Sequence, residues 1–101
     1  MSDASDPASI ASSFDRLEQL LEFPVDFPLK IMGRRVDGFA QAVADVVCAH
    51  VPDFDPAGVE LRASSKGTWL SVTVVVRVHS RTQLEALYRA LAAHPLVRVV
   101  L

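Results

Sequence analysis

The chain is short, half apolar and close to neutral. Its 101 residues include 10 Lys and Arg against 12 Asp and Glu, for a formal net charge of −2, and 50% of them are hydrophobic. This length suits one domain with a modest core. No basic field spans the chain, which argues against nucleic acid as a partner, and the high apolar content favours association between copies. We therefore expect a homodimer.

The amino terminus and the single cysteine restrict the cellular location. Asp3 and Asp6 stand where a secretory signal would carry basic residues. No apolar run reaches the length that spans a bilayer. Cys48 lies in a run of valines and alanines on a predicted helix, where a small buried or half-buried thiol is expected rather than a nucleophile. We expect a cytoplasmic protein without a membrane segment or an internal disulfide.

The first part of the chain predicts a leader followed by a short helix. Residues 1–13 are mostly Ser, Ala and Asp, too polar to offset the entropy of ordering, so we expect a disordered leader. Apolar residues at helical spacing predict a helix over residues 14–22, and the Phe-Pro step at Phe23 stops it. The single folded domain is expected to span residues 14–101.

The next segment predicts a strand and a long helix. Residues 27–32 alternate apolar and polar side chains and end at Gly33, the pattern of a half-buried strand. Valines and alanines then recur every three or four residues from Val36 to about His50, which predicts a helix. Asp37 is expected in its first turn, where a carboxylate suits the helix dipole.

A hairpin, a second helix and a last strand complete the pattern. Residues 59–63 and 70–78 carry apolar side chains at every second position, which predicts two strands, and turn residues lie between them. A capping-box pattern starts the second helix near Ser80, and the helix is expected to end before Pro95. In the last strand, residues 97–101, alternation predicts that Val99 and Leu101 face the core.

The order β-α-β-β-α-β predicts an α+β protein with the ferredoxin-like fold, preceded by the short N-terminal helix. Right-handed crossovers would place both helices on one face of a four-stranded antiparallel sheet and leave the other face open. The residues expected on the open face mix charge with Trp and Val. They are Lys30, Met32, Glu60, Arg62, Trp69, Ser71, Thr73, Val75, Arg77, Arg98 and Val100.

Several short segments, in a fixed order, carry a family resemblance. They are LLEFP at 20–24, FPLKIMG at 27–33, SSKG at 64–67 followed by SVTV at 71–74, LEALY at 84–88 and VRVVL at 97–101. Together, over residues 17–101, they resemble the YbeD-like family of uncharacterised bacterial proteins. The resemblance implies a fold similar to ACT-type regulatory domains and suggests a connection with lipoate metabolism. It brings no agreed catalytic residues.

The corner after the first strand is one candidate ligand site. Gly33, Arg34 and Arg35 offer backbone N–H groups and two guanidiniums to a carboxylate or phosphate. In ACT-type domains, small ligands are commonly held near this loop at a subunit interface. A solvated corner is the simpler interpretation, and we favour it because Asp37 already offers the helix dipole a partner.

The predicted hairpin turn is a second candidate. Ser64, Ser65, Lys66 and Gly67 offer hydroxyls, an ammonium and a glycine backbone to an oxyanion. The same residues are typical of a soluble turn, and this interpretation is favoured.

A partner on the open face would contact several side chains of the sheet. An RNA-recognition sheet would need aromatic side chains where Thr68 and Leu70 stand, so a dimer interface is the better expectation for the lone tryptophan. The residues expected to meet a partner are Trp69, Thr73, Val75 and Arg98.

The sequence contains no recognisable catalytic or cofactor motif. His50, His79 and His94 have no cysteine or carboxylate at metal-ligand spacing, and no serine stands in a Gly-x-Ser-x-Gly elbow. We therefore expect no catalytic residues, no metal and no cofactor. The expected function is a non-catalytic regulatory or small-ligand-sensing module. The alternative is a protein-interaction adaptor that uses the open sheet face.

Overall fold

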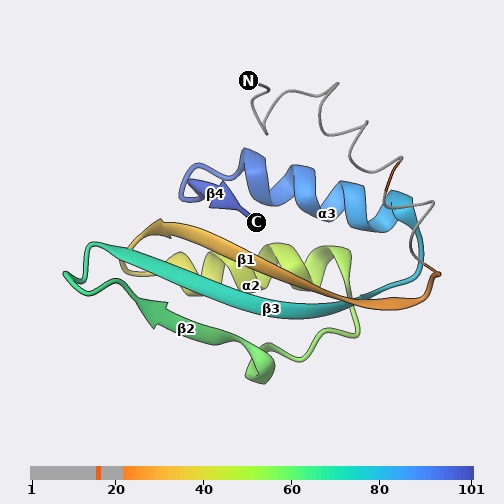
Figure 1. Ribbon diagram of the computed structural model, residues 1–101, viewed down its shortest axis with the longest axis horizontal. Helices are drawn as coiled ribbons and strands as arrows, with labels where there is room; N and C mark the ends of the chain where they lie inside the picture. Colours follow the sequence, from red (N-terminus) through yellow and green to blue (C-terminus); the bar gives the residue numbers. More distant parts are fainter. Residues whose placement is uncertain (1–15, 17–21) are drawn as a thin grey trace.

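The computed structural model describes Arg16 and residues 22–101. In these ranges a four-stranded antiparallel sheet of order β2-β3-β1-β4 packs against helices α2 and α3 (Figure 1). The elements are β1 (Val25–Arg34), α2 (Phe39–His50), the 3-10 helix η1 (Pro56–Gly58), β2 (Glu60–Ala63), β3 (Trp69–Val78), α3 (Arg81–Ala93) and β4 (Val99–Val100). The predicted ferredoxin-like α+β arrangement is confirmed. The predicted leader and most of the predicted helix at 14–22 lie outside the described residues.

The core lies between the two helices and the two long central strands. β1 and β3 pair from Val25 opposite Val78 to Arg34 opposite Trp69. The alternation predicted for both strands places one set of their side chains against α2 and α3, where burial removes them from water and stabilises the fold. The fully buried side chains of this core include Leu29, Ile31, Phe39, Val43, Val47, Val72, Val74, Val76, Val78, Leu84, Leu87 and Leu91.

The helix α2 begins later than its apolar spacing indicates. Gly38 is the N-cap, with a left-handed φ of 83° that glycine adopts at little cost, and the first helical residue is Phe39. Val36 is exposed, and Asp37 precedes the helix. The expectation that the helix starts at Val36 with Asp37 in its first turn is therefore wrong.

The start of α3 follows the predicted capping pattern. The Ser80 hydroxyl oxygen accepts a hydrogen bond from the Gln83 N–H at 3.1 Å, which satisfies a free donor of the first turn. The Gln83 side chain accepts from the His79 N–H at 2.7 Å and donates to the His50 carbonyl oxygen at 3.0 Å. One amide side chain therefore ties the end of α2 to the start of α3.

The last strand is displaced by a β-bulge. Val99 is the register partner of Met32, and the Arg98 N–H also donates to the Met32 carbonyl oxygen at 2.8 Å. Arg98 and Val99 therefore both stand opposite Met32, which is the arrangement of a β-bulge. After the bulge Val100 faces the core, 8% exposed, whereas Val99 and Leu101 are 44% and 66% exposed. The prediction that Val99 and Leu101 face the core, with Val100 on the open face, is wrong.

The strand β2 forms one edge of the sheet and stays in contact with solvent. Its four residues are all exposed. Leu61 is opposite Val72 and so lies on the helix side of the sheet, but it remains 56% exposed. Leu61 therefore lies on the predicted face of the sheet, but its side chain is not buried.

The bulge predicts unequal stability effects for two neighbouring valines. Val100→Ala removes buried methyl groups and is expected to lower the free energy of unfolding by about 1.5–3 kcal/mol. Val99→Ala removes exposed atoms and should cost less than about 0.5 kcal/mol. Urea unfolding followed by circular dichroism measures both changes. Equal costs, or a larger cost for Val99→Ala, would contradict the register of β4.

Gly33 is required by close packing. A methyl group there would collide with the Leu96 carbonyl oxygen and lie 2.6 Å from Cε2 of Phe39. We expect Gly33→Ala to destabilise the domain by about 1–3 kcal/mol through overpacking. Gly58→Ala is the matched control, because a methyl group there meets no atom within 4 Å. The same urea titration compares the two variants, and equal stability would refute this account of Gly33.

Candidate functional site

The two loops predicted as ligand sites lie side by side. Register pairs Arg34, at the end of β1, with Trp69, at the start of β3. One residue further along, the Arg35 N–H donates to the Thr68 carbonyl oxygen at 2.9 Å. A methyl group on Gly67 would lie 3.3 Å from Nη1 of Arg35, so this guanidinium packs against the hairpin turn. The 33–35 corner and the 64–67 turn therefore form one surface.

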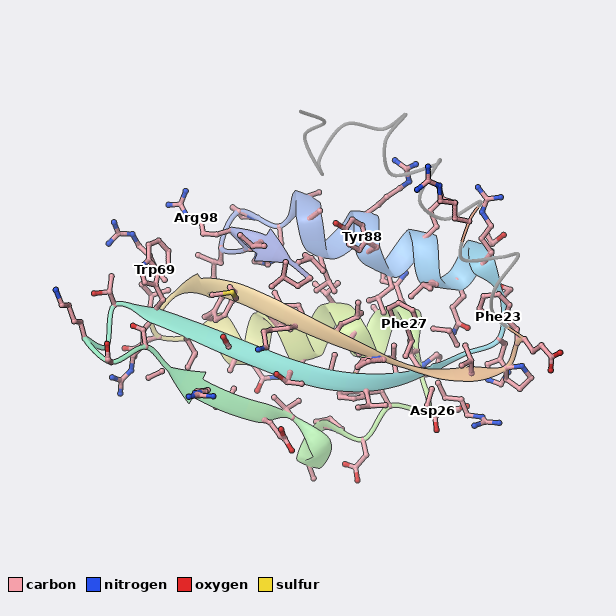
Figure 2. All side chains as sticks on the ribbon, in the orientation of Figure 1. Phe23, Asp26, Phe27, Trp69, Tyr88 and Arg98 are labelled. Atoms are coloured by element: carbon pink, nitrogen blue, oxygen red, sulfur yellow. The ribbon has the colours of Figure 1, made fainter. Side chains whose placement is uncertain are left out.

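An arginine and the only tryptophan meet at the centre of this surface. The Arg34 guanidinium carbon lies 5.5 Å from the Trp69 ring centroid, within the range of a cation–π interaction. Both side chains are partly open to solvent. Trp69 and Arg98 lie at one end of the molecule, and Asp26 lies at the other (Figure 2).

Much of the predicted hairpin turn is occupied in holding its own shape. The Gly67 N–H donates to the Ser64 carbonyl oxygen at 2.9 Å, and the Trp69 N–H donates to the Ser64 hydroxyl oxygen at 3.1 Å. Gly67 has a left-handed φ of 73°, which favours glycine in such a turn. Ser65 and Lys66 are exposed at its tip. Lys66 is thus the turn residue best placed to attract an anion.

Backbone donors of the 33–39 segment are also largely used. The Val36 N–H bonds the Arg34 carbonyl oxygen at 2.9 Å, and the Phe39 N–H bonds the Val36 carbonyl oxygen at 3.2 Å. Gly33 is buried against Phe39, and packing alone accounts for this glycine. An anion at this corner would therefore be attracted chiefly by the guanidiniums.

We call this region the basic end, defined by five of the ten Lys and Arg residues of the chain. These are Arg34, Arg35, Arg62, Lys66 and Arg98. All five are exposed, and none makes an ion pair with a residue of the described ranges. Asp37 is the acidic residue of the adjoining loop. The basic end therefore carries a net positive charge although the chain as a whole is slightly acidic.

The open sheet face continues from the basic end in rows set by the register. Met32, Ser71 and Arg62 form one row, and Lys30, Thr73 and Glu60 form the next. Val75 stands opposite Pro28 further along and is exposed. The predicted open-face residues Trp69, Thr73 and Val75 therefore share this side of the sheet, whereas Val100 does not.

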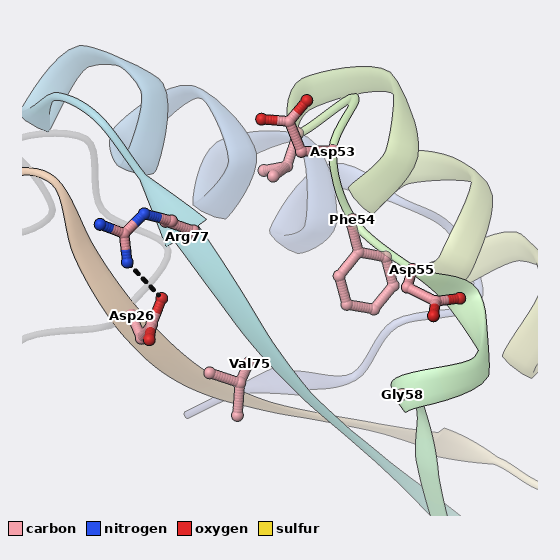
Figure 3. Close-up of a pocket in the computed structure, with 8 residues that line it drawn as sticks. Asp26, Asp53, Phe54, Asp55, Gly58, Val75 and Arg77 are labelled. Carbon is pink, nitrogen blue, oxygen red and sulfur yellow. Dashed lines mark hydrogen bonds and ion pairs between the residues drawn. The ribbon is translucent and has the colours of Figure 1, made fainter.

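A hollow of about 310 Å³, which was not predicted above, lies at the far end of the sheet (Figure 3). Phe54 points from its loop toward β3 beside Val75. Nη1 of Arg77 lies 3.3 Å from Oδ1 of Asp26, an exposed pair that contributes little stability. The remaining lining residues are Val51, Asp53, Asp55 and Gly58.

Sequence reasoning missed this group because its members are far apart in the chain. The Asp-Phe-Asp sequence at 53–55, framed by prolines, was the available signal. One of its carboxylates has a local role, because Oδ1 of Asp55 accepts from the Ala57 N–H at 2.9 Å and caps η1. The hollow is acidic, in contrast to the basic end.

The part of the chain that the structure describes contains neither a candidate metal cluster nor a membrane-spanning helix. There, His, Cys, Asp and Glu side chains form no group of three that could hold a metal ion. No helix in those ranges is both long and apolar enough to cross a bilayer.

Comparison with known proteins assigns the family. The family model described as "Protein of unknown function (DUF493)" matches residues 18–101, which include every strand from β1 to β4 and both helices between them. The chain belongs to the DUF493 family. The resemblance to the YbeD-like family of uncharacterised bacterial proteins is thereby confirmed.

Curated relatives of this DUF493 chain come from several bacteria. A UPF0250 protein of a Janthinobacterium species is 50% identical over 90 residues, covering 89% of this chain and 99% of the relative. UPF0250 proteins of Ralstonia nicotianae and Bordetella pertussis are each 51% identical over 84 residues, covering 83% of this chain and 87% and 92% of those relatives. Their names identify the family and state no activity.

Proposed function

We propose that this DUF493 protein is a non-catalytic regulatory module that binds a small anionic ligand at its basic end and acts as a homodimer. The observation that carries the proposal is the meeting of Arg34 and Arg35 with the Lys66 turn and the Trp69 ring. These cations lack acidic partners in the described ranges. In the sequence, the Arg34–Arg35 corner and the Lys66 turn were separate candidates. Together they place two guanidiniums and an ammonium on one surface, a combination that neither loop has alone.

The chemistry of the basic end favours a carboxylate or phosphate ligand with an apolar part. A guanidinium can bind either anion through two parallel hydrogen bonds, and Lys66 adds a point charge. The Trp69 ring offers a flat apolar surface beside these charges. Lipoate combines a carboxylate with an apolar ring, so it is a reasonable probe of the proposed connection with lipoate metabolism. The resemblance to ACT-type domains supports a ligand shell completed by a second copy.

The absence of a catalytic role is part of the same proposal. Nucleophilic catalysis needs a nucleophile held beside a base. The single cysteine, Cys48, is half-buried within α2, on the side of the sheet away from the open face. We propose that the basic end binds its ligand without chemical change.

A protein-interaction adaptor is the second candidate, and one observation favours it. Val75, Val99 and Leu101 are exposed apolar side chains of the sheet. Exposed apolar side chains rimmed by charge are typical of protein-docking surfaces. This candidate does not require the basic end to bind a small molecule.

The ligand proposal predicts a thermal shift together with a change in tryptophan fluorescence. Lipoate, inorganic phosphate, amino acids and nucleotides are the probes. A ligand at 100 times its dissociation constant adds about 2.7 kcal/mol to the stability of the native state and raises the melting temperature by several degrees. Trp69 is the only tryptophan, so its fluorescence reports binding at the basic end.

Paired variants locate the site. Arg34→Gln with Arg35→Gln should weaken binding at least tenfold, because charged hydrogen-bond donors are lost. Arg81→Gln with Arg89→Gln is the control, since both arginines pair with Glu85 on α3 and their replacement removes the same two charges elsewhere. Binding that survives in the Arg34, Arg35 variant would place the site elsewhere. A protein that responds to none of the probes would favour the adaptor.

A further inference from the structure

The outer edge of β2 is free to pair with another strand. No other described element lies along this edge in Figure 1. The Ser64 N–H donates to Trp69 of β3, so by antiparallel alternation Arg62 and Glu60 also direct their N–H and C=O groups toward β3. Leu61 and Ala63 therefore direct theirs outward. Such unpaired edge groups are a template for another chain.

The side chains of β2 divide cleanly between the two faces of the sheet. Glu60 and Arg62 stand opposite Thr73 and Ser71 and lie on the open face. Leu61 stands opposite Val72, on the helix side, and is more than half exposed. Neither Glu60 nor Arg62 has an ion-pair partner among the described residues.

This Glu-Leu-Arg sequence is complementary to itself when two copies run antiparallel. With the two-fold axis at Leu61, each Glu60 stands opposite Arg62 of the other copy, and the two Leu61 side chains meet on the other face. The backbone agrees, because Leu61 directs its N–H and C=O outward, as a symmetric hydrogen-bonded pair requires. An axis at Arg62 would oppose like charges and present inward-facing backbone groups.

We propose that two copies of this chain pair antiparallel along β2, with the two-fold axis at Leu61. The two four-stranded sheets then form one continuous sheet, with all the helices on the same side. This inference specifies the self-association included in the proposed function, and it does not depend on ligand binding. The partner is a second copy because the charge pattern of β2 complements itself.

The short strand and the adjoining 3-10 helix η1 restrict the ladder to a few residues. A small interface of this kind gives a dimer that dissociates on dilution.

A proline at the axis is the sharpest test. Because the Leu61 N–H faces outward, Leu61→Pro removes no hydrogen bond to β3, and proline is tolerated on such an edge. Sedimentation velocity over a wide concentration range should show the native chain passing from monomer to dimer and Leu61→Pro remaining monomeric. Circular dichroism of dilute samples checks that the variant is folded.

Charge reversal tests the register without touching the backbone. Glu60→Arg and Arg62→Glu should each weaken the dimer at least tenfold, because each places like charges opposite one another. An equimolar mixture of the two variants should associate again, since opposite charges then face each other. Lys30→Glu is the matched control, because Lys30 lies in the same row of the open face but on β1.

Amide hydrogen exchange supplies an independent measurement. Protection of the Leu61 and Ala63 amides should rise with protein concentration, whereas the Arg62 amide, bonded to β3, should be protected throughout. A chain that stays monomeric at millimolar concentration overturns the inference. So does a dimer that persists in Leu61→Pro but is lost in Lys30→Glu, which would indicate face-to-face packing. The ligand-induced change in Trp69 fluorescence, measured on the native chain beside its oligomeric state, separates this result from the proposed ligand function: a monomer whose fluorescence responds refutes only the pairing, and a dimer that does not respond refutes only the ligand proposal.

Discussion

The ten-residue pairing of β1 with β3 determines both the core and the neighbours of the charged side chains. Its register places one alternating set of side chains against α2 and α3 and leaves the other set on the open face. It also brings Arg34 to Trp69 at one end and Asp26 to Arg77 at the other. A slip of one residue would exchange the buried and exposed sets, so the core itself fixes which charged groups meet.

The regular parts of the fold were predictable because their patterns are local. The valines of β3 recur with period two, and the Ser80 cap and Gln83 mark the start of α3. The errors arose where long-range contacts override a local pattern. The bulge opposite Met32 reverses which of Val99 and Val100 faces the core, and the Gly38 N-cap moves the start of α2 past Asp37.

The candidate site was predictable in its parts and not in its assembly. The residue types of the corner and of the turn each suggest anion binding. Only the pairing of Arg34 with Trp69 shows that the two loops share one surface. The hollow beside Phe54 was missed because Asp26 and Arg77 are joined only by strand pairing. A sequence without register does not reveal such neighbours.

The separation of charge between the ends of the sheet has a kinetic consequence. In the described ranges, cations gather near Trp69 and carboxylates around Phe54, so charge of opposite sign lies at the two ends of the sheet. This arrangement would turn the anionic ligand proposed above toward the basic end before any contact forms and so raise the rate of productive encounters. This steering weakens as salt shortens the Debye length, to about 8 Å at physiological ionic strength. For the proposed ligand, long-range charge would therefore set the direction of approach before the short-range contacts of the site set the affinity.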